Sequence, residues 1–228
     1  MNPLVNLAGK RGLIIGIAND SSIATGCAEM FTACGARLAA TYLNEKSLPW
    51  VTPTAERLGI EWLAPCDVRE DGALEALFEE VRTKWGGLDF LLHSIAFAPR
   101  DDLHGRVVDC SETGFEMAMN VSCHSFLRMA RLAPVKAALE SATRYVAAEL
   151  GSKHIRAHAI SPGPIATRAA SGIEHFDELL DRAAAEAAAH ELTTIQDVGA
   201  LAAFLVSDAA RHITGTVIPV DGGQHLFA

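Results

Sequence analysis

The segment "GIANDSSIATG", which runs from Gly16 to Gly26, carries residue types that suit the binding of a phosphate group. It follows an apolar run and leads into a stretch with helical spacing. A turn that opens a helix offers free backbone N–H groups and a positive dipole end to a pyrophosphate. Gly16 would permit a sharp turn, Ser21 or Ser22 could cap the helix, and Gly26 could let the helix pack closely against the strand. The GxGxxG spacing is absent, so simple turn chemistry is the alternative interpretation.

The segment "TYLNEK" (41–46) ends the second apolar run and bears on which dinucleotide would bind. An acidic residue at the end of this strand usually binds the ribose 2′-hydroxyl of NAD, whereas a basic residue binds the 2′-phosphate of NADP. No arginine stands directly there, and Lys46 lies further along. The segment therefore favours NADH or NAD over NADPH.

The elements that must position these segments are visible as apolar runs that alternate with helical patterns. Helical patterns are expected at 21–35 and 69–87, the second with acidic residues in its first turn and Lys84 near its end. Such alternation predicts an α/β fold with a single doubly wound parallel sheet of the Rossmann type and helices on both faces. We expect residues 1–228 to form one domain. Strands are expected at 11–17, 37–43, 60–66, 88–97, 154–161 and 215–223.

The composition sets limits on function. Half of the 228 residues are apolar and 21% are charged, which is enough to bury one substantial core. The net charge of −9 and the lack of a Lys/Arg-rich run argue against nucleic acid as a partner. The chain shows no secretory signal and no apolar stretch near the roughly 18 residues of a membrane helix. Five cysteines without a CxxC pair fit reduced thiols in a cytoplasmic protein, and we expect no metal site.

Five segments, in the same order, resemble those of the enoyl-acyl-carrier-protein reductases, a branch of the short-chain dehydrogenase/reductase family. The first is the turn with Gly16 and Ser22-Ile23-Ala24. "HSIAFAP" stands where other short-chain dehydrogenases usually carry Asn-Asn-Ala-Gly. The remaining segments are "CDV" (66–68), "HSIAFAP" (93–99), "SPGPIATRAASGI" (161–173) and "DVGALAAFLVSD…ITGTVIPVDGG" (197–208 and 213–223).

The resemblance implies a cofactor site in the loops that follow the strands. Asp67 would accept the adenine amino group, although it could merely cap the next helix. The backbone of Ile165 would pair with the nicotinamide carboxamide, and Thr167 would reach the phosphates. Ala98 would face the acyl substrate, although a small residue is equally a packing choice. The cofactor-binding residues implied in this way are Gly16, Ser22, Ile23, Leu43, Asp67, Val68, Ser94, Ile95, Ala96, Lys136, Ile165, Ala166 and Thr167.

Some of these residues depart from the family's pattern or have a simpler explanation. Leu43 stands where members of the family often place a polar contact to the adenosine, which is a departure from the pattern. Ser94, Ile95 and Ala96 would line the nicotinamide ribose, but on their own they are strand residues that lead into a loop. His93, in the same apolar run, is interpreted as a core histidine rather than a catalytic one.

The catalytic helix of the family reads Tyr-x-x-Met-x-x-x-Lys, and only its lysine end has a counterpart. "PVKAALES" makes Lys136 the matching lysine, which the resemblance implies binds the nicotinamide ribose hydroxyls. The family's tyrosine stabilises the enolate that forms during hydride transfer. Its position, seven residues before the lysine, holds Met129. The two tyrosines of the chain, Tyr42 and Tyr145, lie elsewhere and cannot be matched to it.

A larger segment is missing with the tyrosine. The helical pattern that ends at Ala133 should be followed by a strand, and a strand–crossover–strand unit takes about 30 residues. We therefore expect about 30 residues to be missing between Ala133 and Pro134. Without this fifth strand the sheet would be split, and each unpaired buried N–H or C=O would cost about 1–3 kcal/mol. Either the active polypeptide has a segment that this sequence omits, which we favour, or a truncated chain rearranges and is inactive.

The function that the resemblance implies is NADH-dependent reduction of the trans-2 double bond of enoyl thioesters in type II fatty-acid synthesis. One alternative is a ketoacyl or alcohol dehydrogenase of the same family, against which "HSIAFAP" counts. The other is a catalytically dead NAD(H)-binding protein, if the deletion is real.

The resemblance also implies partners. The substrate would be an acyl chain on acyl carrier protein, an acidic partner, and relatives are commonly homotetramers. The segment 170–191 would form either a lid over the acyl chain or a plain core helix. Its alanine-rich part, 181–191, is a strong helix former expected to face solvent. The apolar residues at helical spacing in this segment are Ile173, Phe176, Leu179 and Leu180.

Overall fold

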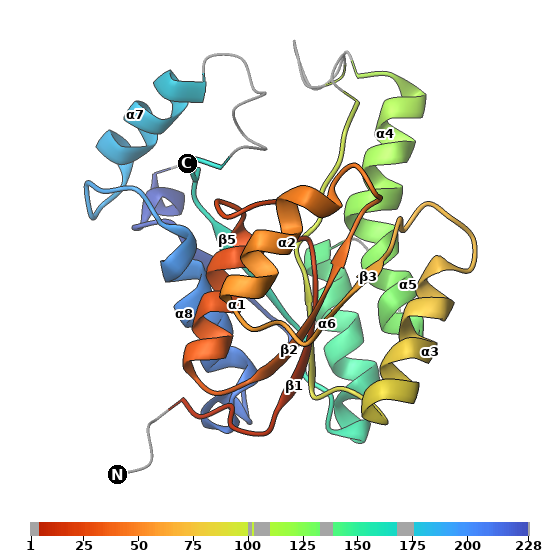
Figure 1. Ribbon diagram of the computed structural model, residues 1–228. Helices are drawn as coiled ribbons and strands as arrows, with labels where there is room; N and C mark the ends of the chain where they lie inside the picture. Colours follow the sequence, from red (N-terminus) through yellow and green to blue (C-terminus); the bar gives the residue numbers. More distant parts are fainter. Residues whose placement is uncertain (1–4, 100–101, 103–109, 133–138, 168–175, 228) are drawn as a thin grey trace. The chain divides into compact units, whose positions relative to one another are not determined.

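The computed structural model of the protein describes residues 5–99, 102, 110–132, 139–167 and 176–227 (Figure 1). These residues fall into two compact units. The first lies within Met1–Ile95, Arg131–Ala133 and Ile195–Thr214, and the second within Ala96–Ala130, Pro134–Thr194 and Gly215–Ala228.

The first unit contains a parallel four-stranded sheet. Its strands are β1 (Arg11–Ile15), β2 (Arg37–Tyr42), β3 (Trp62–Pro65) and β4 (Phe90–His93), in the order β3-β2-β1-β4. The central strand β1 pairs with both β2 and β4, and four of its five residues are buried. Apolar runs of this kind are typical of a parallel sheet that is covered on both faces.

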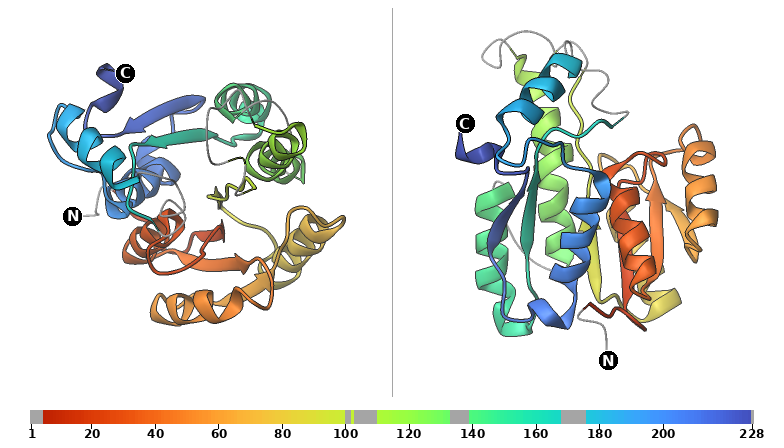
Figure 2. Two further views of the ribbon diagram at one scale, coloured as in Figure 1. Left: turned by 90° about the horizontal axis from the view of Figure 1, so that it is seen from above. Right: turned by 90° about the vertical axis from the view of Figure 1, so that its left-hand side faces the viewer.

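Helices connect these strands. They are α1 (Ile23–Ala33), α2 (Leu48–Arg57) and α3 (Ala73–Trp85). The chain moves outward through α1 and α2 and returns through α3, so right-handed crossovers put α1 and α2 on one face and α3 on the other (Figure 2). Helix α8 (Ile195–Val206) and the short 3₁₀ helix η6 (Asp208–Ala210) also belong to this unit.

Two glycines bring α1 and α8 into close contact. A Cβ atom on Gly26 would overlap the carbonyl oxygen of Ile195, and one on Gly199 would overlap the carbonyl oxygen of Gly26. The expectation that Gly26 serves helix–strand packing is therefore wrong. Its close neighbour is a helix about 170 residues away, and no local pattern indicates such a partner.

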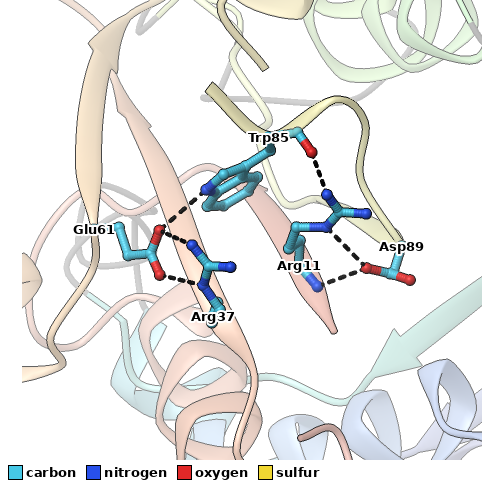
Figure 3. Close-up of polar contacts among 5 residues, drawn as sticks. All are labelled: Arg11, Arg37, Glu61, Trp85 and Asp89. Atoms are coloured by element: carbon cyan, nitrogen blue, oxygen red, sulfur yellow. Dashed lines mark hydrogen bonds and ion pairs between the residues drawn. The ribbon is translucent and has the colours of Figure 1, made fainter. Parts of the chain in front are cut away.

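Charged side chains join the amino-terminal ends of the four strands (Figure 3). Arg37, the first residue of β2, donates from Nε and Nη2 to the two carboxylate oxygens of Glu61, at 2.5 and 3.0 Å. The indole N–H of Trp85 donates to the same carboxylate at 3.0 Å. Arg11 donates its backbone N–H to Asp89 at 2.8 Å and its guanidinium to the carbonyl oxygen of Trp85. These bonds fix the edge of the sheet that holds the amino-terminal ends of the strands. Ligands of α/β proteins bind at the opposite edge, at the carboxyl ends of the strands.

The second unit holds a two-stranded parallel sheet of β5 (His158–Pro162) and β6 (Thr216–Val220). Helix α6 (Leu139–Leu150) packs against this sheet, and its Val146, Ala147 and Leu150 form a small core with Ala157. The other helices of the unit are α4 (Glu112–Met119), the π-helical turn η3 (Asn120–His124), α5 (Ser125–Leu132), η4 (Gly151–Lys153), α7 (Phe176–Glu186) and η7 (Gln224–Leu226).

The alanine-rich segment is only partly solvent-facing. Helix α7 ends at Glu186, and Ala183 and Ala187 are 3% and 2% exposed. The expectation of a solvent-facing run is wrong at these positions, because small alanines can pack where larger side chains cannot. Phe176, Leu179 and Leu180 are half-buried, and Ile173 lies outside the described residues.

The strands of the described residues thus form two separate sheets, of four and two strands. Along the described chain, β4 is followed by α4, η3, α5 and α6 before β5, without a strand between them. This is the split that the missing segment predicts. Helix α5 ends at Leu132 and α6 begins at Leu139, so Ala133, Pro134 and Lys136 lie outside the described residues.

Candidate functional site

The turn between β1 and α1 depends on a glycine. Gly16 has a φ of +127°, which other residues rarely adopt, and a Cβ atom there would overlap the carbonyl oxygen of Ser94. The N–H of Ser94 donates to the carbonyl of Ile15 at 2.8 Å and so continues the β1–β4 ladder. The side chain of Ile95 lies next to the same turn. Gly16, Ser94 and Ile95 therefore meet at the carboxyl ends of β1 and β4, as the sequence predicted.

The amino terminus of α1 is held by a different network from the one expected. Ser22 is the N-cap by position, but its side chain makes no capping hydrogen bond. Its hydroxyl donates to the carbonyl of Asn19 at 3.0 Å and bonds the hydroxyl of Thr25 at 2.9 Å. Side-chain capping by Ser22 is thus wrong, because its hydroxyl is turned towards the Asn19 carbonyl and the Thr25 hydroxyl and accepts no backbone N–H of the first turn. The hydroxyl consequently does not occupy the N–H groups of the first turn, which begins at Ile23.

Asp67 follows β3 and lies in a sheltered position, with its side chain 14% exposed. Arg69 donates to this carboxylate from Nε at 2.9 Å and from Nη2 at 2.5 Å, and also from its backbone N–H at 3.0 Å. The bonds from Arg69 hold the pKa of Asp67 below its ordinary value, against the opposing effect of burial. Val68 between them is buried. The sequence interpretation missed Arg69, although its position two residues after Asp67 was a usable signal.

The end of β2 presents an apolar side chain to solvent, since Leu43 is 48% exposed. The polar groups that follow Leu43 form hydrogen bonds with one another within the turn. The side chain of Asn44 accepts from the backbone N–H groups of Lys46 and Ser47, at 3.0 and 3.2 Å. Lys46 itself is exposed. Within this turn, Lys46 is the side chain whose charge could meet a 2′-phosphate.

His93 ends β4 and is half-buried. Burial lowers the pKa of His93 to about 4, so the imidazole is neutral near pH 7. A neutral, partly sheltered imidazole fits the interpretation of His93 as a core histidine.

In the second unit, the segment after β4 is anchored to the π-helical turn. The N–H of Phe97 donates to the hydroxyl of Ser122 at 3.2 Å, and the Phe97 ring is 44% exposed. Ala96 is exposed and Ala98 half-buried on either side of it. Single π turns often occur at functional sites. Ser122 was not among the predicted site residues, because helical spacing alone does not reveal a π turn.

The loop after β5 carries three further predicted residues. Ile165 is 8% exposed, and its carbonyl accepts the N–H of Thr167 at 2.8 Å, which closes a tight turn around the exposed Ala166. Earlier in the loop, the N–H of Gly163 donates to the carbonyl of Val220 in β6 at 3.0 Å. These bonds tie the start of this loop to the small sheet.

No tyrosine of the described residues stands in the expected catalytic position. Met129, which occupies the matching place in the sequence, is fully buried on α5. Tyr145 is 64% exposed on α6, and the hydroxyl of Tyr42 lies 3.4 Å from Glu45. The predicted catalytic residue Lys136 lies outside the described residues.

The described residues contain no group of three or more His, Cys, Asp or Glu side chains placed to hold a metal ion. None of their helices combines the length and apolarity of a membrane span.

A glycine turn after β1, an uncapped helix start and a β3-β2-β1-β4 order define a dinucleotide-binding protein of the Rossmann type. The family model described as enoyl-(acyl carrier protein) reductase matches residues 16–134 and, separately, residues 132–225. The chain belongs to the enoyl-acyl-carrier-protein reductase family, which confirms the resemblance and the fold class.

Individual relatives agree over nearly the whole chain. It is 37% identical to enoyl-[acyl-carrier-protein] reductase [NADH] 2 of Rhizobium meliloti over 255 residues, covering 99% of this chain and 94% of that protein. It is 40% identical to the NADH enzyme of Haemophilus influenzae over 252 residues, covering 97% and 96%. Both alignments are longer than the 228 residues of this chain.

Solved structures agree as well. The reductase of Anaplasma phagocytophilum in complex with NAD has a TM-score of 0.91 at 37% identity, covering 99% of this chain and 97% of that one. The NADH reductase of Aquifex aeolicus has a TM-score of 0.90 at 35% identity, covering 98% and 99%. The chain is thus a member of a family of NADH-dependent oxidoreductases of fatty-acid synthesis.

Proposed function

We propose that this protein reduces the trans-2 double bond of enoyl-acyl-carrier-protein thioesters with NADH. The observation that carries the proposal is the match to reductases of this specificity over 97–99% of the chain. The β1–α1 turn fits a dinucleotide, because Gly16 packs against the carbonyl of Ser94 with no room for a side chain, so the carboxyl ends of β1 and β4 lie close together.

The residues of the first unit would bind the cofactor through its adenosine and phosphates. The turn at Gly16 and the N–H groups at Ile23 would hold the pyrophosphate, because helix starts attract anions. Asp67 and Val68 would contact the adenine, and Leu43 would pack against the adenosine. When bound, NADH would supply a hydride to C3 of the enoyl thioester, and a proton would then be added at C2.

The resemblance also implies cofactor contacts for residues of the second unit. Ile165 would pair through its backbone with the carboxamide, while Ala166 and Thr167 would approach the phosphates. The consecutive residues Ser94, Ile95 and Ala96, which follow β4, would line the ribose. Ala98 would face the acyl chain, and the bond between Phe97 and Ser122 would keep that loop in place.

The active polypeptide, in our proposal, carries about 30 residues between Ala133 and Pro134 that the 228-residue sequence lacks. Two findings support this. The family model matches in two pieces that meet at residues 132–134, and the alignments to relatives are longer than the chain. The segment would supply the strand between β4 and β5 and the tyrosine that stabilises the enolate, with Lys136 binding the ribose hydroxyls.

A catalytically dead NAD(H)-binding protein is the second candidate. Two observations favour it. Met129, at the position of the family's tyrosine, is fully buried. Tyr145 follows Lys136 in the sequence, whereas the family's tyrosine precedes the lysine. This candidate would hold if the 228-residue chain were the complete polypeptide.

We further propose a protein partner, an oligomeric state and a cellular location for this protein. The acyl carrier protein would dock through a local basic patch, since the net charge of −9 gives no general attraction to an acidic partner. The candidates, by charge alone, are Arg100, Arg128, Arg131 and Lys153. We also propose a homotetramer and a cytoplasmic location, as the resemblance to the family implies. NADH is favoured over NADPH, although the related reductase of Bacillus cereus was solved with NADP⁺.

The test is an NADH oxidation assay with crotonyl thioester. Turnover by the natural polypeptide supports the reductase, and NADH binding without turnover supports the dead binding protein. If a folded sample neither binds NADH nor turns over, the assignment of a dinucleotide site fails. A ketoacyl or alcohol dehydrogenase would instead oxidise NADH with a ketone substrate and leave crotonyl thioester unchanged.

A further inference from the structure

The pairing of Arg69 with Asp67 has a geometry that suggests a role beyond charge balance. The guanidinium forms a two-pronged contact, with Nε at 2.9 Å from Oδ1 and Nη2 at 2.5 Å from Oδ2. The backbone N–H of Arg69 adds a third bond, at 3.0 Å to Oδ1. Three bonds from one residue fix both the rotation and the tilt of the carboxylate.

The same geometry leaves acceptor capacity on one oxygen. A carboxylate has about four lone-pair sites, two on each oxygen. Oδ1 accepts hydrogen bonds from the backbone N–H and from Nε. Oδ2 accepts one from Nη2 and, at 3.2 Å, shares the single Nε proton with Oδ1. Three protons of Arg69 thus face about four lone-pair sites, which leaves Oδ2 able to accept from one further donor.

The surroundings hold this arrangement at the carboxyl end of β3. Val68, between the two partners, is 3% exposed, and the N–H of Glu70 donates to the carbonyl of Asp67 at 3.0 Å. The side chain of Asp67 is 14% exposed and that of Arg69 is 44% exposed. A sheltered carboxylate is thus fixed by an arginine that itself lies partly in solvent.

We propose that Arg69 is a positioning residue, which orients the Asp67 carboxylate so that Oδ2 accepts a hydrogen bond from the 6-amino group of the cofactor's adenine. This inference rests on the proposed NADH site. It gives Arg69 no direct contact with the cofactor; the residue acts through Asp67. The lowered pKa of Asp67 agrees with it, because an ionised carboxylate offers only acceptors.

The test compares two dinucleotides that differ at one group. NADH carries the 6-amino group, whereas its hypoxanthine analogue carries a carbonyl oxygen there and cannot donate. Dissociation constants for both ligands are measured by fluorescence titration on the natural polypeptide and on its Arg69→Ala, Arg69→Lys and Asp67→Ala variants. Circular dichroism and thermal melting of each variant accompany the titrations.

The wild-type protein should bind NADH more tightly than the analogue. Arg69→Ala should weaken NADH binding by about three- to tenfold, as expected when a charge-assisted hydrogen bond is loosened but not abolished. The analogue should bind unchanged or slightly better. Arg69→Lys should fall between, because lysine keeps the charge without the fork. Asp67→Ala should remove the preference between the ligands altogether.

Arg82→Ala is the matched control, since Arg82 pairs with Glu79 on the exposed surface of α3. It should leave both dissociation constants unchanged. The positioning role is overturned if Arg69→Ala weakens both ligands equally, or if the wild type does not distinguish them. A folded wild type that binds neither ligand overturns the proposed NADH site and this inference together, whereas equal losses on Arg69→Ala overturn the inference alone.

Discussion

Replacing Gly16 with alanine should lower the free energy of unfolding by about 2–6 kcal/mol. Two costs contribute. A φ of +127° is strained for any residue with a Cβ atom, at about 1–3 kcal/mol. The new methyl group would also overlap the carbonyl oxygen of Ser94, which is backbone and cannot rotate away. Overpacking of this kind costs about 1–3 kcal/mol.

Gly59→Ala separates the two costs. Gly59 also has a positive φ, +64°, but a Cβ atom there would meet no atom within 4 Å. Alanine at this position should cost only about 1–2 kcal/mol, from conformation alone. Urea denaturation of both variants, with circular dichroism as the readout, gives the difference. If Gly16→Ala is no more destabilising than Gly59→Ala, the close approach of the turn to Ser94 is refuted.

Three further predictions concern packing, pH and thiol reactivity. Gly26→Ala should lower the free energy of unfolding in urea by about 1–3 kcal/mol, because α8 crosses α1 there, even though alanine has the better helix propensity. Gly151 has open space around it, so Gly151→Ala should lie within about 1 kcal/mol of wild type. Hydrogen bonds from Arg37 lower the pKa of Glu61. The contribution of Glu61 to the free energy of unfolding is therefore present above its ordinary pKa of 4.5 and is lost as pH falls through the lowered value. The stability gap between wild type and Glu61→Gln, about 0.5–1 kcal/mol at pH 7, should therefore shrink in acid; a gap that grows would contradict this. Burial raises the pKa of Cys27 to about 12, so iodoacetamide should alkylate it only after unfolding, which peptide mass mapping detects; rapid labelling of the native protein would be inconsistent with its burial.

The fold was largely predictable because its signals are local. Each strand of the first unit is a short apolar run, and these strands form a parallel sheet, as the alternation of strands and helices predicts. Helix α2 was not recognised, because Pro49 and Pro53 interrupt its pattern. Proline near a helix start is tolerated, but its meaning depends on where the helix begins.

The candidate site was predictable in its positions but not in its contacts. Residues at strand ends, such as Gly16 and Asp67, could be named because the topology brings those ends together. The hydroxyl of Ser22 was assigned to the wrong partner, since a cap and a bond to the carbonyl of Asn19 use the same short side chain. The anchoring of Phe97 by Ser122 depends on a π turn that no sequence period indicates.

The prediction of a missing strand rests on a different kind of signal. Two helical patterns follow one another where an α/β fold needs a strand, and the described strands form two sheets rather than one. A conflict between local pattern and overall topology of this kind is informative, because natural sequences are usually consistent at both levels.

The measurement that tests the central proposal most directly is the intact mass of the polypeptide purified from its natural source. The 228-residue chain has a mass of 24.2 kDa. If the active reductase carries one more strand–crossover unit between Ala133 and Pro134, its mass should be about 3 kDa higher, as about 30 additional residues require. A natural polypeptide of 24.2 kDa that oxidises NADH with crotonyl thioester would contradict the proposal.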